Sequence, residues 1–131
     1  MVSIRNTGGV SLLLFGSTFL WVTPMFAAAD VDTSGTAWAA TGILAAVTIS
    51  GFTVATWGLF RRVSWWETLA ALSAVVGLAV LVPYWVAATE SGVANPAFDV
   101  VIHAAGSAGV LVLLRVPRLE HWVHAHVAAG H

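Results

Sequence analysis

Four apolar stretches, each about 20 residues long and separated by short polar turns, constrain the fold of this chain more than any other feature. They cover residues 8–29, 37–60, 65–88 and 97–116. A helix of about 20 residues crosses the roughly 30 Å hydrocarbon core of a bilayer. The chain is 59% hydrophobic and 8% charged, whereas a soluble domain carries about 25% charged residues. The sequence therefore predicts an all-α, multi-pass membrane protein whose four transmembrane helices form one domain over residues 1–118.

The turn between the second and third stretches predicts how the helices are oriented. Arg61 and Arg62 lie at the end of one expected helix, where cations complement the free carbonyls and the helix dipole. Ser64 and Glu67 have the spacing of a capping box at the start of the next helix. Because arginines near the ends of spans stay on the cytoplasmic side, this turn and both termini are predicted to lie in the cytoplasm, with the chain in the cell membrane.

The distribution of charge agrees with that orientation. All cationic side chains fall on the predicted cytoplasmic side, and they are Arg5, Arg61, Arg62, Arg115 and Arg118. Most acids fall on the opposite side, namely Asp30, Asp32, Glu90 and Asp99. The arginines form no patch typical of nucleic-acid binding. The chain has no Cys and no Lys, which excludes disulfides, thiolate ligands and Schiff-base chemistry.

The four stretches are expected to pair as two similar helical hairpins. Short connections make neighbouring helices antiparallel, which predicts a four-helix bundle. Pro24 and Pro83 lie near the outer ends of the first and third stretches, and each removes a backbone amide and bends its helix. A polar turn and a second apolar stretch follow each proline. This pattern indicates an internal repeat of two tandem hairpins.

The repeat resembles that of a known family. The segments Thr23-Pro24-Met25 and Val82-Pro83-Tyr84, with the entry Trp65-Trp66-Glu67, are similar to the SPW-repeat integral membrane proteins of bacteria and archaea. That family is named after a Ser-Pro-Trp tripeptide, of which this chain keeps the proline in both copies. The resemblance implies a prokaryotic four-span protein and implies no defined reaction.

Asp99 and His103 are the candidate polar pair inside a span. Their i, i+4 spacing places both side chains on one face of the fourth helix, where they are expected to meet. An ionisable residue within a span is a functional hypothesis by default, and the pair would suit a proton relay or an ion-entry site. The alternative is a structural histidine near the outer rim that hydrogen-bonds a neighbouring helix or water.

The last segment, residues 119–131, is predicted to be a short cytoplasmic helix lying on the membrane surface. Its apolar face contains Leu119, Trp122, Val123 and Val127. His121 and His124 lie on the opposite face and are weak candidates for metal ligands because imidazole binds transition metals. The alternative is an ordinary polar face, and the sequence predicts no cofactor.

Three functions are consistent with these features. The preferred one is a structural or accessory-subunit role without enzymatic activity, with the lipid bilayer and other membrane subunits or further copies of the chain as partners. The first alternative is a small transporter or channel that uses Asp99, His103 and helices bent at Pro24 and Pro83. The second is a metal- or haem-binding membrane protein.

Overall fold

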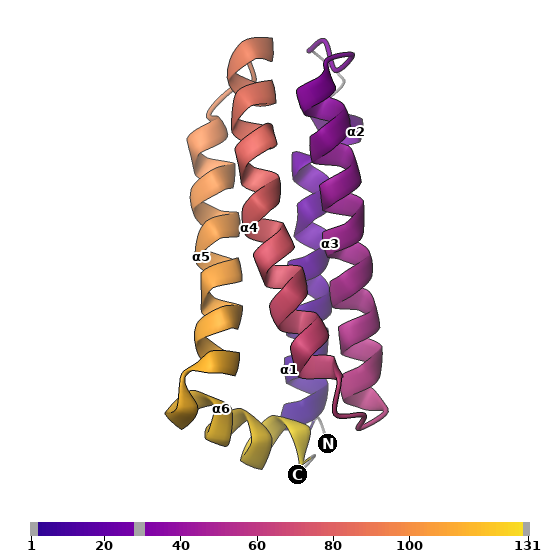
Figure 1. The fold of residues 1–131 in the computed structure, drawn as a ribbon, viewed down its shortest axis with the longest axis vertical. Coiled ribbons are helices and arrows are strands. Elements are labelled where there is room, and N and C mark those ends of the chain that lie inside the picture. The colour runs from indigo at the N-terminus through magenta and orange to yellow at the C-terminus, as the bar shows by residue number, and fades with distance from the viewer. Residues whose placement is uncertain (1–2, 28–30, 130–131) are drawn as a thin grey trace.

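The computed structural model describes residues 3–27 and 31–129 as a helical bundle with a tail that crosses one end (Figure 1). The described residues contain no strand. The elements are the α-helices α1 (Ile4–Ser17), α2 (Pro24–Ala27), α3 (Thr36–Phe60), α4 (Trp66–Ser91), α5 (Pro96–Arg115) and α6 (Pro117–Val123), the 3-10 helix η1 (Thr18–Val22) and the π-helical turn η2 (His124–Ala128). The prediction of an all-α chain is therefore confirmed. The prediction for residues 28–30, which include Asp30, and for residues 130 and 131 lies outside the described residues.

Three helices are long and apolar enough to cross a membrane. They are α3, α4 and α5, with 25, 26 and 20 residues. Their bounds match the stretches expected at 37–60, 65–88 and 97–116 closely. They differ in how far the other helices cover them. Within the most apolar 18 residues of each helix, 44% are buried inside the bundle for α4 and 17% for α5. Helix α5 is therefore the most peripheral of the three.

The first apolar stretch is not the single helix expected over residues 8–29. Helix α1 starts earlier, at Ile4, because the Ser3 hydroxyl accepts a hydrogen bond of 3.1 Å from the Asn6 amide and caps it. It ends at Ser17, tightens into η1 and restarts as α2 at Pro24. Thr23 is extended, with φ −79° and ψ 153°, as the residue before a proline prefers. Proline thus interrupts this segment instead of bending it.

The two prolines are not equivalent in the structure. Pro83 lies inside α4, which continues through it from Trp66 to Ser91. Pro24 is the first residue of α2, where its missing amide removes no helical hydrogen bond. Only Pro83 therefore occupies the place predicted for both residues, within a continuous helix.

The turn between α3 and α4 is closed by backbone hydrogen bonds and not by the predicted capping box. The amides of Val63 and Arg62 donate to the carbonyls of Gly58 and Leu59 at 3.0 and 3.1 Å, the pair of bonds that defines a Schellman motif. Arg62 takes the left-handed conformation, with φ 58°, that glycine usually supplies there. Trp65 is the N-cap of α4 without a side-chain cap bond, so Ser64 does not cap this helix.

Apolar side chains of the bundle form two clusters, one above the other. The first cluster lies toward the end of the bundle opposite the termini, which is called the outer end below. It contains Phe19 and Phe52 together with Trp38 and Tyr84. The second cluster lies at the end where both termini are found, and there the tail contributes Val123 and Val127 to a group of α3, α4 and α5 residues. The tail is thus docked against the bundle through Val123 and Val127, whereas Trp122 of the predicted apolar face is 48% exposed.

Small residues allow the closest approach between helices. An added Cβ at Gly51 of α3 would overlap Oγ of Ser73 in α4 and lie 3.1 Å from its Cβ, so a larger residue here requires Ser73 to shift. Gly109 of α5 is different, because nothing lies within 4 Å of its added Cβ. The sequence alone does not distinguish these two glycines.

Gly51→Val is expected to lower the free energy of unfolding in mild detergent micelles by about 1–3 kcal/mol, because overpacking separates α3 from α4. Gly109→Val, the same change where space is open, is the matched control and should shift stability by no more than about 0.5 kcal/mol. Equal effects of the two substitutions would contradict the close packing of α3 on α4.

Candidate functional site

The outer end of the bundle contains a hydrogen-bonded pair that joins α4 to α5. The hydroxyl of Tyr84 donates to Oδ2 of Asp99 at 2.6 Å, and Tyr84 is 2% exposed. Asp99 lies in the first turn of α5, where a carboxylate also complements the positive end of the helix dipole. The Asp99 side chain is therefore held by a neighbouring helix, a partner that sequence spacing did not indicate.

His103 is buried one turn further along α5 and contacts two backbone carbonyls. Its Nδ1 lies 2.7 Å from the oxygen of Asp99, and its Nε2 lies 3.1 Å from the oxygen of Thr18 in η1. The ring also packs against Phe19, with 4.8 Å between ring centroids. A neutral imidazole donates from one nitrogen only, so it satisfies one of these carbonyls, whereas a doubly protonated ring satisfies both.

Asp99 and His103 share one helix face, as predicted, but their side chains do not bond to each other in the described structure. The carboxylate bonds to Tyr84, and the imidazole lies beside carbonyls of α5 and η1. This arrangement corresponds to the structural alternative, in which the histidine bonds a neighbouring element.

Ser107 extends the same face to i+8 from Asp99. It is fully buried, and its Oγ is the one buried side-chain polar atom without a partner among the described residues. Beyond it, toward the end where the termini lie, α5 presents Val110, Leu111 and Leu114 to the core clusters. The polar face, defined here as Asp99, His103 and Ser107, thus ends within the bundle. The spacing of four residues could have identified Ser107 from the sequence.

The outer turns are tied together by a second set of hydrogen bonds. Nε1 of Trp38 donates to Oγ of Ser91 at 2.8 Å, and that hydroxyl lies 3.1 Å from the carbonyl of Asp32, to which it donates. The Asp32 carboxylate in turn accepts hydrogen bonds from the hydroxyl and amide of Ser34, which lower the pKa of this exposed carboxyl. These contacts fix the loop before α3 against the end of α4.

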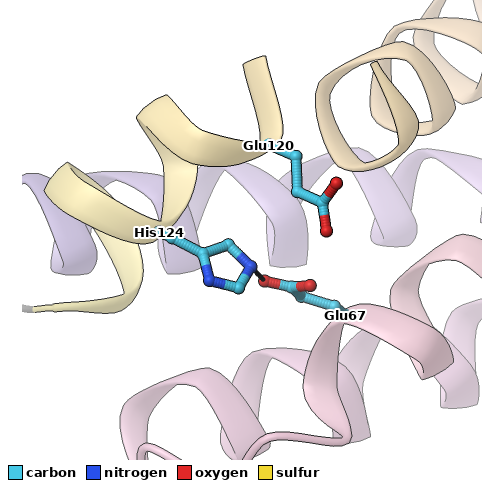
Figure 2. Close-up of side chains that lie close together, drawn as sticks. All are labelled: Glu67, Glu120 and His124. Carbon is cyan, nitrogen blue, oxygen red and sulfur yellow. Dashed lines mark ion pairs between the residues drawn. The ribbon is translucent and has the colours of Figure 1, made fainter. Parts of the chain in front are cut away.

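A group of ionisable side chains joins the tail to the start of α4. Figure 2 shows Glu67 of α4 facing Glu120 of α6 and His124 of η2, with an ion pair between Nε2 of His124 and Oε1 of Glu67. One ligand atom from each residue lies within 4.8 Å of the other two. Glu67, predicted to cap its helix, instead faces the tail. Of the two predicted metal candidates, His124 belongs to this cluster and His121 does not.

The Glu67, Glu120 and His124 cluster has the donor chemistry of a divalent-cation site. Carboxylate oxygens and imidazole nitrogen bind Zn²⁺ at about 2.0–2.2 Å, which places ligand atoms about 4 Å apart or less. The ligand atoms of Glu67 and His124 are already in contact, so these two side chains would need to move apart to admit an ion between them. His124 is exposed and Glu67 and Glu120 are half-buried, so an ion can reach the cluster from solvent.

Arg61 and Arg62, which carry the predicted orientation, lie on the surface at the same end. The Arg61 guanidinium carbon lies 5.7 Å from the centre of the Trp57 ring, which stacks on Trp65 with 6.0 Å between centroids. Arginine beside exposed tryptophans is typical of a membrane–water interface.

Comparisons of the chain with family models, with curated proteins and with solved structures found no match.

Tyr84→Phe and Asp99→Ala are each expected to lower the free energy of unfolding by about 1–2 kcal/mol, because each removes one partner of a half-buried hydrogen bond. In a double-mutant cycle the coupling energy should lie near 0.6–1.7 kcal/mol, the range for hydrogen bonds between transmembrane helices. Glu90→Ala, the same kind of change at an exposed acid near the end of α4, is the control. A coupling energy of zero would contradict the bond.

Proposed function

We propose that this chain is a small, non-enzymatic membrane protein with a structural role, as an accessory subunit of a larger membrane complex or as a homo-oligomer. The carrying observation is that Asp99 and His103, the candidate polar pair, contact partners inside the chain. Asp99 bonds Tyr84, His103 lies against two carbonyls, and the polar face of α5 stops at Ser107. A pathway for ions would need polar groups or water across the whole bundle, and α5 offers apolar residues beyond Ser107.

The proposal includes a fourth crossing by the interrupted segment from Ile4 to Ala27. This segment runs beside α3 in Figure 1, and its 3-10 turn is buried against the other helices at Phe19 and Val22. Irregular backbone is tolerated at membrane depth where it is covered by protein. The contact of His103 with the carbonyl of Thr18 supports this placement, because it places an imidazole nitrogen beside the backbone at the interruption.

The proposed orientation puts both termini in the cytoplasm. The arginines lie at the start of α1, in the turn after α3, at the end of α5 and in α6, which all belong to the end of the bundle with both termini. The positive-inside rule assigns that end to the cytoplasm of the cell. The tandem hairpins and the likeness to SPW-repeat proteins are part of the same proposal. The two retained prolines support it, although Pro24 begins a helix and Pro83 lies within one.

Large apolar side chains on the outer faces of the bundle are available to other membrane subunits. On α5, Phe98 and Val101 are 59% and 65% exposed. Lipid covers such faces as well as protein does, so association between helices depends on close packing of small residues. The exposed small residues Ala105 and Ala108 on α5 provide such a surface.

Native mass spectrometry of the protein, extracted mildly from its own membrane, tests this proposal. The expected result is a stoichiometric complex with a second polypeptide or with further copies of the chain. A lone monomer that also carries an ion or proton flux in liposomes, lost in the Asp99→Asn, His103→Ala double variant, would instead establish the transporter alternative. In that outcome the polar face of α5 would be part of the pathway.

A metal-binding role is the second candidate, because Glu67, Glu120 and His124 converge from α4, α6 and η2. The haem alternative has less support, since both nitrogens of His103, the histidine within the long helices, lie beside carbonyl oxygens.

Titration of the full chain in detergent with Zn²⁺, followed by calorimetry, tests the metal role. If the cluster is a metal site, one ion binds per chain and His124→Ala weakens binding more than about tenfold, because loss of an outer partner of a ligand alone costs about 10- to 100-fold. His121→Ala, on the same tail but outside the cluster, should leave affinity unchanged. Equal affinities of wild type and His124→Ala would exclude this site.

A further inference from the structure

A cavity of about 510 Å³ separates α1 from α5 at the end of the bundle where the termini lie. Gly8 and Leu12 line it from α1, and Gly109 and Leu113 from α5. Thr7 and Ser11 are the hydroxyl-bearing side chains in a lining that otherwise consists of apolar residues and glycine. Its volume falls in the range of about 300–1,000 Å³ that is usual for small-ligand sites.

The tail closes this cavity at one end. Val123 and Val127 line it and belong to the second core cluster, and an added Cβ on Gly8 would lie 2.8 Å from Val127. The tail therefore reaches from the end of α5 to the start of α1. Figure 1 shows α6 crossing beneath the space between these two helices.

The cavity is open on the flank of the bundle, between α1 and α5. Leu113 and Trp122 line it and are 42% and 48% exposed, and nothing lies within 4 Å of an added Cβ on Gly109. For a protein embedded in a bilayer, this side faces lipid. An apolar cavity of this size does not hold water, because water needs polar partners.

We propose that the cavity binds one acyl chain of an anionic phospholipid from the leaflet at the arginine-bearing end. The inference rests on the proposed crossing of the membrane by the segment Ile4–Ala27. Along α1 the lining extends from Ile4 to Phe15, a rise of about 16 Å, close to half of the roughly 30 Å hydrocarbon core. The cavity thus has the depth of a single leaflet.

A transmembrane helix of a partner fits this cavity less well than an acyl chain does. A helix is about 10–12 Å wide with its side chains and must continue to the aqueous phase at both ends. The tail blocks that continuation beneath the cavity through Val123 and Val127. An acyl chain ends inside the membrane and enters from the side, so the tail does not obstruct it.

Charge near the closed end specifies the headgroup. Arg115 ends α5 directly after the lining residue Leu114, and Arg118 lies in the first turn of α6, and both are exposed. Each arginine near the membrane surface is expected to raise the affinity for an anionic lipid about fivefold. Since an acyl chain gains little by leaving other chains for an apolar cavity, these arginines supply the preference.

Photolabelling tests the proposal. The full chain is reconstituted in phosphatidylcholine nanodiscs that contain a phosphatidylglycerol probe with a diazirine in its acyl chain, and labelled peptides are quantified by mass spectrometry. Labelling of residues 4–15 and 106–114 should exceed labelling of the lipid-facing positions Ile43 and Val47 of α3, which are 66% and 52% exposed. A phosphatidylcholine probe with the same diazirine should label the cavity several-fold less.

Two variants make the test specific. Gly109→Leu fills the cavity and should reduce its labelling to the level of α3, whereas Ala108→Leu, the neighbouring exposed position on α5, should not. Arg115→Gln with Arg118→Gln should remove the preference for the anionic probe, about fivefold for each arginine.

Uniform labelling of cavity and α3, or equal labelling of Gly109→Leu and wild type, would overturn the proposal. Cross-linking of the cavity to a second polypeptide or to a second copy, in native membranes carrying the probe, would also overturn it. Native mass spectrometry of the same variants distinguishes failure of the lipid proposal from failure of the proposed structural role. A variant that loses the lipid but keeps its partner subunits leaves the structural role intact. A protein that keeps the lipid but has no partner subunits contradicts the structural role alone.

Discussion

Backbone carbonyls inside a bilayer need donors from the protein itself, and this requirement governs the arrangement of the bundle. Helices α3 and α5 meet it within their own turns, and α4 does so except at Pro83, which has no amide to donate. The interrupted first segment does not, because its hydrogen-bonding pattern changes at Thr18 and stops at Thr23. His103 lies against the carbonyl of Thr18 from α5, a helix that otherwise shares little surface with this segment. A polar residue of α5 thus lies where the backbone of the first segment is irregular.

The same contact links the outer polar residues into one unit. Asp99 lies against α4 through Tyr84, and its backbone oxygen lies beside the imidazole of His103. Three segments therefore meet at the outer part of α5, although α5 is the least covered of the long helices. Apolar packing gives little net driving force between helices in a membrane. Hydrogen bonds between specific polar groups therefore hold this part of α5 in place.

Sequence patterns predicted the long helices well because hydropathy alone sets their lengths and positions. Phe60 and Arg115 end α3 and α5 as expected. The first segment was mispredicted because a proline near a helix end either bends or stops the helix, and hydropathy does not separate the two outcomes. The capping box failed for a related reason: Ser64 has the right spacing, but the backbone bonds of the Schellman motif shift the start of α4 to Trp66.

The candidate sites were less accessible to sequence analysis. Glu67 and His124 are 57 positions apart in the chain, and only the docking of the tail brings them together. The partner of Asp99 lies on another helix, so a search for i, i+4 neighbours could not find it. The cavity between α1 and α5 depends on how far two helices stand apart, a property that no local pattern encodes.

The docked tail also has a consequence for biosynthesis. Residues 117–129 are the last described part of the chain to leave the ribosome, and they form the floor between α5 and α1. Until residues 117–129 have been made and docked, that space has no floor. Because the side of the cavity stays open after the tail docks, a lipid that occupies it would still exchange with the bilayer, so the lipid that the protein carries would follow the membrane in which it resides and not the one in which it was made.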